Sequence, residues 1–228
     1  MESLILNEQQ ADGKEFAMRQ HMMLLTEQVG NLGTNCYLLC NKDTMEAVVI
    51  DPGAEGYLIR DVLESKGMRP VAILLTHGHY DHIDGVAALK ESFHSIKTYA
   101  CYEERETLQS TEQNLSEAFG RPCTVNADEF LHDGDKLEFA GAHFRCIHTP
   151  GHTPGGMSFY AIEDEVLFSG DTLFAGSVGR TDFPGGDAKA LLHSIRVKYA
   201  DIGDYVKVCP GHGPTTTMEI ERAENPYM

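Results

Sequence analysis

Residues 76–82 read Thr76-His77-Gly78-His79-Tyr80-Asp81-His82 and place three histidines and one aspartate within seven residues. This stretch directly follows the apolar run at residues 71–75, which predicts a buried strand. The residues from 83 to 90 carry apolar side chains at helical spacing. The histidines and the aspartate are therefore expected on a strand-to-helix loop, where a rigid scaffold commonly holds functional side chains. Four ligand-capable side chains on one loop indicate a metal site.

Three later segments repeat this design, because in each a strand-like run ends and a ligand-capable side chain follows among small or turn-forming residues. These side chains are His152, Asp171 and His212. Glycine lets the backbone turn sharply and leaves room beside a ligand. The repeated placement favours a common site over isolated histidines.

Two runs of strand-like segments, each closed by helical segments, organise the chain. Strands are expected at residues 22–26, 34–40, 47–50, 71–75, 136–139, 144–148, 157–162, 165–169 and 205–209. Helices are expected at residues 55–67, from about 83, at 102–121, at 187–200, and as a short segment within 218–228. This order predicts an α/β fold in which two sheets pack face to face with helices outside. We expect a single domain over residues 21–228, preceded by an extension at residues 1–20.

The charge and composition exclude several classes of function. A formal net charge of −17 argues against nucleic-acid binding and against anionic membrane surfaces, which need clustered lysine and arginine. Hydrophobic residues make up 42% of the chain, a balance typical of globular proteins. No apolar run approaches the roughly 20 residues that span a bilayer. A small-molecule substrate is the expected partner.

The cysteines favour a reducing compartment. None of the six pairs with another at the two-residue spacing of a zinc knuckle or redox motif. Most lie among apolar or β-branched neighbours, so we expect reduced and mostly buried thiols. The start of the chain lacks a basic segment followed by an apolar core, so it does not read as a secretory signal. These features predict a cytoplasmic protein.

The remaining histidines are expected to have packing or surface roles. They are His21, His94, His132, His143 and His193. His148, four residues before His152, is open between a local hydrogen bond and the support of a metal ligand.

The segment 76–82, with His152, Asp171 and His212 in order behind it, resembles the metallo-β-lactamase superfamily. Further segments resemble its glyoxalase II branch and the shorter bacterial relatives of that branch. They are Thr34-Asn35-Cys36-Tyr37, Thr149-Pro150-Gly151-His152-Thr153, Ser169-Gly170-Asp171-Thr172 and, for the shorter relatives, Gly179-Arg180-Thr181-Asp182-Phe183-Pro184-Gly185-Gly186.

The resemblance implies an αββα sandwich, with two mixed sheets flanked by helices, that holds two metal ions at one edge. It assigns His77, His79 and His152 to the first ion, Asp81, His82 and His212 to the second, and Asp171 to a bridge between them. Imidazole and carboxylate ligands suit zinc or iron, and the absence of thiolates among them argues against a closed structural zinc site. Two Zn²⁺ ions are expected, with iron or manganese as the alternative at one position.

The implied reaction is hydrolysis of a thioester by a hydroxide shared between the metals, with Asp81 and Asp171 acting through that hydroxide. Arg180 is a candidate contact for an anionic substrate group; pairing with Asp182 or a backbone carbonyl is the alternative. The chain ends 16 residues after His212, so the helical glutathione-binding domain of glyoxalase II is not expected. S-lactoylglutathione is therefore one candidate substrate among several.

Two other reactions remain open at the level of sequence. Persulfide dioxygenases share the fold and, by resemblance, hold a single iron through the equivalents of His77, His152 and Asp171. A lactone or ester hydrolase needs nearly the same chemistry, and the shape of the pocket decides between them. The natural substrate, the metal used in vivo and the oligomeric state stay undecided.

Overall fold

A six-stranded sheet of mixed direction forms the first half of the structure, a computed structural model that describes residues 18–228. Its strands, in spatial order, are β1 (Met22–Val29), β2 (Thr34–Asn41), β3 (Glu46–Ile50), β4 (Arg69–Leu74), β5 (Lys97–Cys101) and β6 (Glu129–Leu131). The first three pair antiparallel, and β3 to β6 pair parallel. The parallel strands β3 to β6 therefore end at the same edge of the sheet, and residues 76–82 follow β4 at that edge.

A second six-stranded sheet completes the centre of the fold. Its strands, in spatial order, are β14 (Thr216–Thr217), β13 (Lys207–Pro210), β10 (Val166–Gly170), β9 (Met157–Ala161), β8 (Ala142–His148) and β7 (Lys136–Phe139). β10 and β13 are parallel, whereas the other pairs are antiparallel. A small separate ribbon joins β11 (Leu173–Phe174) to β12 (Ser177–Val178).

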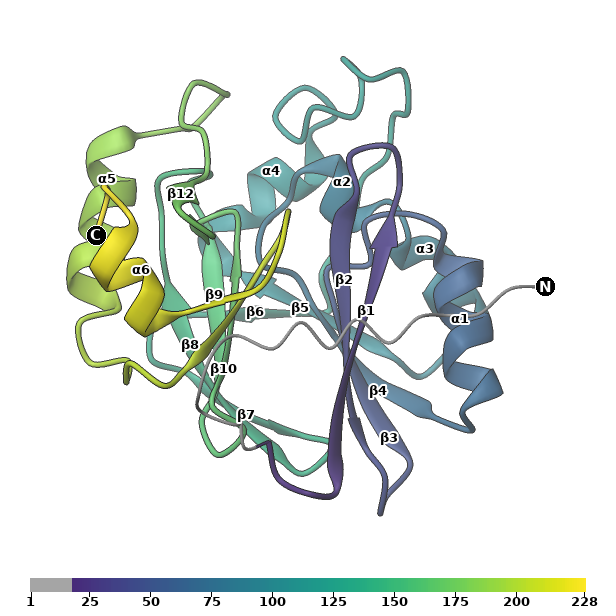
Figure 1. Cartoon of the computed structure of the whole chain (residues 1–228). Coiled ribbons are helices and arrows are strands. Elements are labelled where there is room, and N and C mark those ends of the chain that lie inside the picture. Colours follow the sequence, from purple (N-terminus) through teal and green to yellow (C-terminus); the bar gives the residue numbers. More distant parts are fainter. Residues whose placement is uncertain (1–17) are drawn as a thin grey trace.

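Helices cover the outer faces of both sheets (Figure 1). On the first sheet they are α1 (Gly56–Ser65) and α3 (Val86–Ser92); on the second they are α5 (Ala188–His193), the π-helical turn η2 (Ser194–Lys198) and α6 (Met218–Glu224). Three short segments complete the set: α2 (Tyr80–Ile83), η1 (Tyr102–Glu104) and α4 (Arg105–Gln109). The predicted αββα fold class is confirmed. Within residues 18–228, no helix is both long and apolar enough to cross a membrane.

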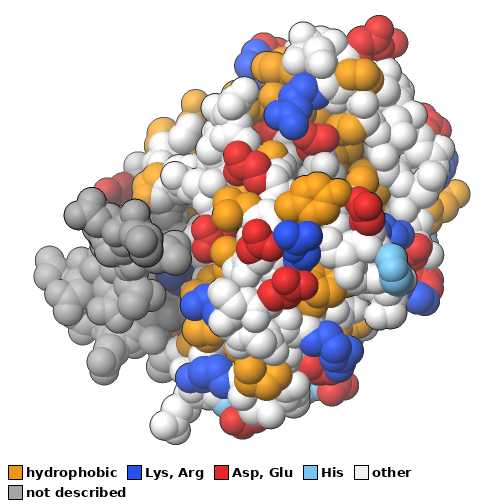
Figure 2. All heavy atoms as spheres, turned by 90° about the vertical axis from the view of Figure 1, so that its right-hand side faces the viewer, with side chains coloured by type: hydrophobic (Ala, Val, Ile, Leu, Met, Phe, Trp, Pro, Cys, Tyr) orange, Lys and Arg blue, Asp and Glu red, His pale blue; other side chains and the backbone are white. Residues whose placement is uncertain are grey.

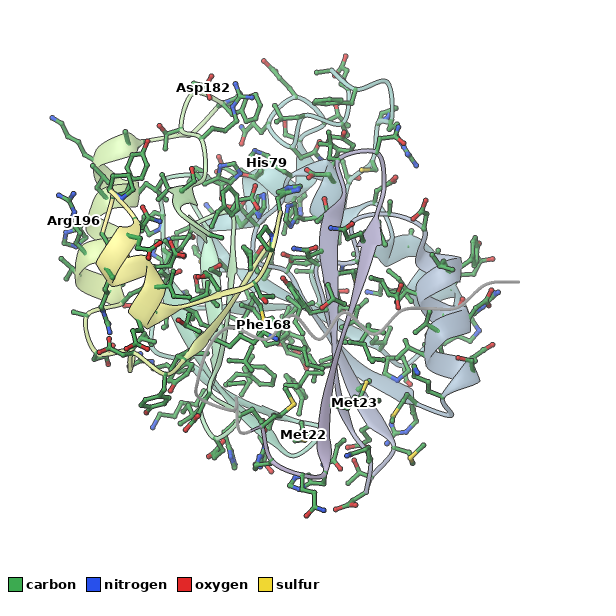
Figure 3. All side chains as sticks on the ribbon, viewed as in Figure 1. Met22, Met23, His79, Phe168, Asp182 and Arg196 are labelled. Atoms are coloured by element: carbon green, nitrogen blue, oxygen red, sulfur yellow. The ribbon has the colours of Figure 1, made fainter. Side chains whose placement is uncertain are left out.

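Alternating side chains of β2 show how the layers are held together. All eight residues of this strand are buried. Tyr37 and Leu39 point into the core between the sheets, whereas Leu38 packs against the helical layer. Phe168 from the second sheet meets Tyr37 with ring centroids 5.4 Å apart, and Figure 3 shows it between the sheets.

The face that carries α1 and α3 intersperses acidic and basic side chains (Figure 2). Arg60 of α1 forms a salt bridge with Asp61, and Lys90 of α3 forms one with Asp128, each with an N–O distance of 2.6 Å. This face therefore offers paired charges rather than a basic strip.

The middle of the chain departs from the sequence-based expectation. The helix predicted over residues 102–121 is wrong beyond Gln109, because residues 111–120 form turns. The side chains of Asn114 and Ser116 bond the Cys123 carbonyl at 2.8 and 3.2 Å and so compete with helical hydrogen bonding. Strands β5 and β6 were not predicted; both are short, and the apolar content of β5 is interrupted by lysine and threonine.

Two predicted helices are present in divided form. The helix expected from about residue 83 begins earlier, at Tyr80, and is split at Gly85, whose backbone N–H bonds the Pro52 carbonyl at 2.8 Å. The helix expected at 187–200 is α-helical only to His193 and continues as the π-helical turn.

Of the predicted extension at residues 1–20, residues 1–17 lie outside the described part of the chain. Arg19 donates two hydrogen bonds to the fully buried carboxylate of Asp164, at 2.9 and 2.7 Å. Met18 packs against the core between the sheets. Residues 18 and 19 are thus joined to the sandwich.

The core between the sheets predicts the effect of truncating Phe168. Phe168→Ala should lower the free energy of unfolding by about 3–5 kcal/mol, because it removes a fully buried ring and leaves a cavity. Tyr205→Ala, at a residue 56% exposed, should change it by about 0.5 kcal/mol or less. Urea unfolding of both variants measures the difference; equal effects would contradict this description of the core.

Candidate metal centre

Loops and the short helix α2 at one edge of the sandwich carry all seven of the predicted ligand side chains. His77 and His79 follow β4, and Asp81 and His82 belong to α2. The other three follow strands of the second sheet: His152 after β8, Asp171 after β10 and His212 after β13. Figure 3 shows His79 at this edge, above the interior position of Phe168.

His77, His79 and His152 form a buried group of imidazoles. One ring nitrogen of each lies within 4.8 Å of the other two, and His152 Nε2 is 2.9 Å from His79 Nδ1. The second nitrogen of His152, Nδ1, is 2.7 Å from the Arg180 carbonyl oxygen, which fixes the ring orientation. A backbone carbonyl in this position is a common partner of metal-binding histidine.

Asp81, His82 and His212 form the neighbouring group. His212 Nε2 lies 3.2 Å from Asp81 Oδ2 and 3.4 Å from His82 Nε2. The Thr34 hydroxyl donates to Asp81 Oδ2 at 3.0 Å and so orients this carboxylate. The group contains both imidazole and carboxylate donors.

Asp171 lies between the two groups. Its Oδ2 is 3.5 Å from His152 Nε2 and 3.6 Å from His212 Nε2, and its Oδ1 is 3.5 Å from His82 Nε2. One carboxylate therefore reaches donors of both groups, as a bridging ligand must.

Asp51 supports the centre and was not predicted as a site residue. It accepts hydrogen bonds from the Thr76 amide at 2.7 Å and the Thr76 hydroxyl at 2.6 Å, and its Oδ2 is 2.9 Å from His82 Nδ1. His82 thereby presents Nε2 to the centre. The sequence offered a signal, since Asp51 follows β3 and precedes Pro52-Gly53, the same strand-end design as the predicted ligands.

Burial and neighbouring charges shift the pKa values of His77 and His79 in one direction and that of His82 in the other. Burial and the nearby His152 lower the pKa of His79 to about 3, and burial and His82 lower that of His77, so both are neutral donors. Burial alone would lower the pKa of His82, but Asp81, Asp171 and Asp51 raise it to about 10. The same negative field favours a divalent cation, which would displace the proton.

The donor atoms fit bound cations. The buried atoms His77 Nε2 and Asp171 Oδ1 have no hydrogen-bond partner in the described part of the chain. Buried polar atoms are normally satisfied, so unsatisfied nitrogen and oxygen atoms among these residues indicate a ligand. Two imidazole pairs in contact also need a proton or a cation between them.

Residues 29–215 match the family model described as the metallo-beta-lactamase superfamily. This chain belongs to that superfamily. It is 36% identical over 202 residues to a probable metallo-hydrolase, YqgX, of Bacillus subtilis, covering 88% of this chain and 94% of the relative. It is 37% identical over 200 residues to the hydroxyacylglutathione hydrolase GloC of Haemophilus influenzae, covering 85% and 92%.

Solved structures of superfamily members are also similar. The B3 metallo-beta-lactamase BLEG-1 has a TM-score of 0.85 and 41% identity, covering 90% of this chain and 99% of that one. TTHA1623 in a di-iron-bound form has a TM-score of 0.80 and 36% identity, covering 90% and 100%. The chain is thus a metallo-hydrolase of this superfamily, with histidine and aspartate clusters for divalent metal.

The predicted substrate contact Arg180 lies beside this superfamily site. Its guanidinium makes two hydrogen bonds of 2.6 Å to Asp182 and lies 3.9 Å from the centroid of the Phe183 ring. The Phe183 ring in turn contacts His79, with centroids 5.7 Å apart. The guanidinium of Arg180 thus pairs with Asp182, as the alternative to a substrate contact predicts. The backbone carbonyl of Arg180 orients His152.

Glu104 joins two of the loops that carry the imidazoles. The side chain is fully buried and accepts from the Gly78 amide at 2.8 Å and from the Gly155 amide at 2.7 Å. Gly78 lies between His77 and His79, and Gly155 lies three residues after His152. This carboxylate therefore fixes the spacing of the two loops. The acidic run at residues 103–106 favours a solvated helix face, and the burial of Glu104 shows that this interpretation is wrong for Glu104.

Glu104 should give the metal-free protein a characteristic pH dependence. Burial raises its pKa from 4.5 to about 7, so the folded chain binds more protons than the unfolded chain between these values. Its favourable contribution to the free energy of unfolding is present at low pH and is lost as pH rises through that window.

Between pH 4.5 and 7, the free energy of unfolding of wild type should fall by on the order of 3 kcal/mol relative to that of Glu104→Gln, because glutamine does not titrate. Urea unfolding at several pH values measures this change, and the control Glu106→Gln, at an exposed position, should follow wild type. Parallel curves for wild type and Glu104→Gln would contradict the assignment.

Gly211 leaves room for the bridge between the groups. A Cβ there would lie 2.2 Å from Asp171 Oδ1 and 2.6 Å from His82 Cε1. Gly211→Ala should therefore weaken metal binding by about tenfold or more, because both side chains must shift. Gly203→Ala is a matched control, since the atoms nearest to its Cβ belong to the ring of the exposed Tyr205. Zinc titration of both variants tests this; equal affinities would contradict the close approach.

Proposed function

We propose that this chain hydrolyses an acyl thioester of the hydroxyacylglutathione type and uses two zinc ions. The position of Asp171 carries the proposal, because its carboxylate lies within 3.6 Å of donors in both groups. Cations held by the two groups would then be neighbours that share one ligand. When bound, such a pair lowers the pKa of water toward neutrality and polarises a carbonyl group.

The side chains of the site hold the metal ions and orient one another, and none of them attacks the substrate. His77, His79 and His152 offer imidazole nitrogens to the first ion, and Asp81, His82 and His212 offer nitrogen and oxygen atoms to the second. Asp51 and Thr34 fix the rings and carboxylates of the second group through hydrogen bonds. A thioester suits this arrangement because a thiolate leaves without a proton, so the chain need not supply a general acid.

The choice of substrate and metal rests on the relatives and on donor chemistry. The similarity to a hydroxyacylglutathione hydrolase over 85% of the chain favours a thioester of this type. Imidazole and carboxylate donors suit zinc, and the di-iron form of a similar structure makes iron the main competitor.

Arg180 is the proposed contact for an anionic end of the substrate. Its side chain is 57% exposed, and the Phe183 ring contacts both its guanidinium and His79. A substrate carboxylate would take the place of Asp182 on the guanidinium, which is suited to bidentate pairing.

The function is tested by metal content and turnover measured together. Protein purified without added metal should contain two equivalents of zinc and should release thiol from S-lactoylglutathione. Asp171→Ala should lose metal and reduce kcat/KM by roughly 100-fold or more, since the shared ligand is removed. The control His94→Ala lies outside both groups and should stay within about twofold of wild type.

Different outcomes contradict different parts of the proposal. Full activity of Asp171→Ala with two ions bound would defeat the assignment of the bridge. Two zinc ions without thioester hydrolysis would leave the metal centre intact and reject the substrate class. One iron per chain, with oxygen uptake on glutathione persulfide, would establish a persulfide dioxygenase instead.

A further inference from the structure

A second cluster of metal-ligand side chains lies outside the centre described above. It consists of Cys101, Glu103 and His148, and one ligand atom of each lies within 4.8 Å of the other two. None of the three belongs to the groups around Asp171. We propose that this cluster binds a further divalent cation of the zinc type.

The three side chains come from both sheets. Cys101 is the last residue of β5 and Glu103 follows in η1, whereas His148 is the last residue of β8. Cys101 is 1% exposed, His148 is half-buried and Glu103 is exposed. A cation held by this cluster would therefore connect the first sheet to the start of the loop that carries His152, with solvent access from the side of Glu103.

Existing hydrogen bonds hold the three side chains in place. Cys101 Sγ lies 3.0 Å from Glu103 Oε2, so the thiol donates to the carboxylate. His148 Nε2 lies 3.0 Å from the Pro154 carbonyl oxygen. A carbonyl only accepts, so Nε2 donates in this hydrogen bond and Nδ1 is the nitrogen left to bind a cation. Metal-binding histidines are commonly held through their other nitrogen in this way.

The chemistry of the three donors selects the cation. Thiolate, imidazole and carboxylate together suit zinc, whereas magnesium and calcium prefer oxygen donors throughout. Bond lengths near 2.3 Å to sulfur and 2.0 Å to nitrogen place the two donors about 3.5 Å apart in a tetrahedral site. The ligand atoms lie within 4.8 Å of one another, so the sulfur and nitrogen donors need to approach by at most about 1.3 Å when an ion binds. Glu103 is exposed, so its side chain can rotate to follow them, and water takes the fourth position.

Binding requires the Cys101 thiol to ionise. Burial and the hydrogen bond to Glu103 raise its pKa, so without a cation the sulfur keeps its proton. The cation takes the place of that proton between Sγ and Oε2, and one proton leaves to solvent for each ion bound. The charges balance, because a divalent cation meets one thiolate and one carboxylate.

Cobalt(II) provides a test that separates this cluster from the main centre. The seven side chains of the main centre contain no sulfur, so they cannot give a thiolate-to-cobalt charge-transfer absorption. The full chain, stripped with a chelator and titrated with cobalt(II) alone, should show this near-ultraviolet band. The full chain should bind one equivalent of cobalt(II) more than the main centre alone binds.

Variants assign the band to this cluster. Cys101→Ser should lose the band and one equivalent of cobalt, while Cys123→Ser, a half-buried cysteine outside the cluster, should keep both. Glu103→Gln changes an exposed residue, so folding is expected to be retained, and the affinity for that equivalent should fall about tenfold. No thiolate band in wild type, or a band that persists in Cys101→Ser, would overturn the proposal. Either result is independent of thioester hydrolysis.

Discussion

The crowding of imidazoles and carboxylates at one edge of the sandwich is the constraint on which the surrounding structure depends. Such groups are costly to bury unless each is paired or bound to a cation. The fold meets this constraint with fixed partners: Asp51 holds His82, Thr34 holds Asp81, and the Arg180 carbonyl holds His152. The absence of a side chain at Gly211 lets Asp171 reach both groups. Preorganisation of this kind removes most of the reorganisation that metal binding would otherwise require.

Most of the fold and of the candidate site could be predicted from strand-like runs and from the residues that follow them. The αββα class followed from two runs of strands closed by helices, and the ligand-capable residues lie together because parallel strands of each sheet end at one edge. Their role as ligands stays a prediction. The residues around Asp51 favour a turn and those around Glu104 a solvated helix face, because the actual partners of both carboxylates are amides and side chains from distant loops. The Cys101 cluster had no spacing signal for the same reason.

Both halves of the fold contribute to each group of donors. The first group takes two imidazoles from the loop after β4 and one from the loop after β8; the second takes two side chains from α2 and His212 from the second sheet. A cation that binds only the docked sheets stabilises the folded state by mass action. Metal occupancy and the packing around Phe168 should therefore reinforce each other, and the cluster of Cys101 and His148 spans the two sheets in the same way.

The link from Arg180 to the centre runs through its main chain, whereas its guanidinium points to Asp182 and Phe183. The path of the backbone here is tied to the orientation of His152, but the identity of the side chain is not. Its neighbour Gly179 is fixed, because a Cβ there would lie 1.8 Å from the Asp171 carbonyl oxygen. Position 180 itself can acquire new side chains during evolution, or in the laboratory, and so select different substrates while the metal ligands remain undisturbed.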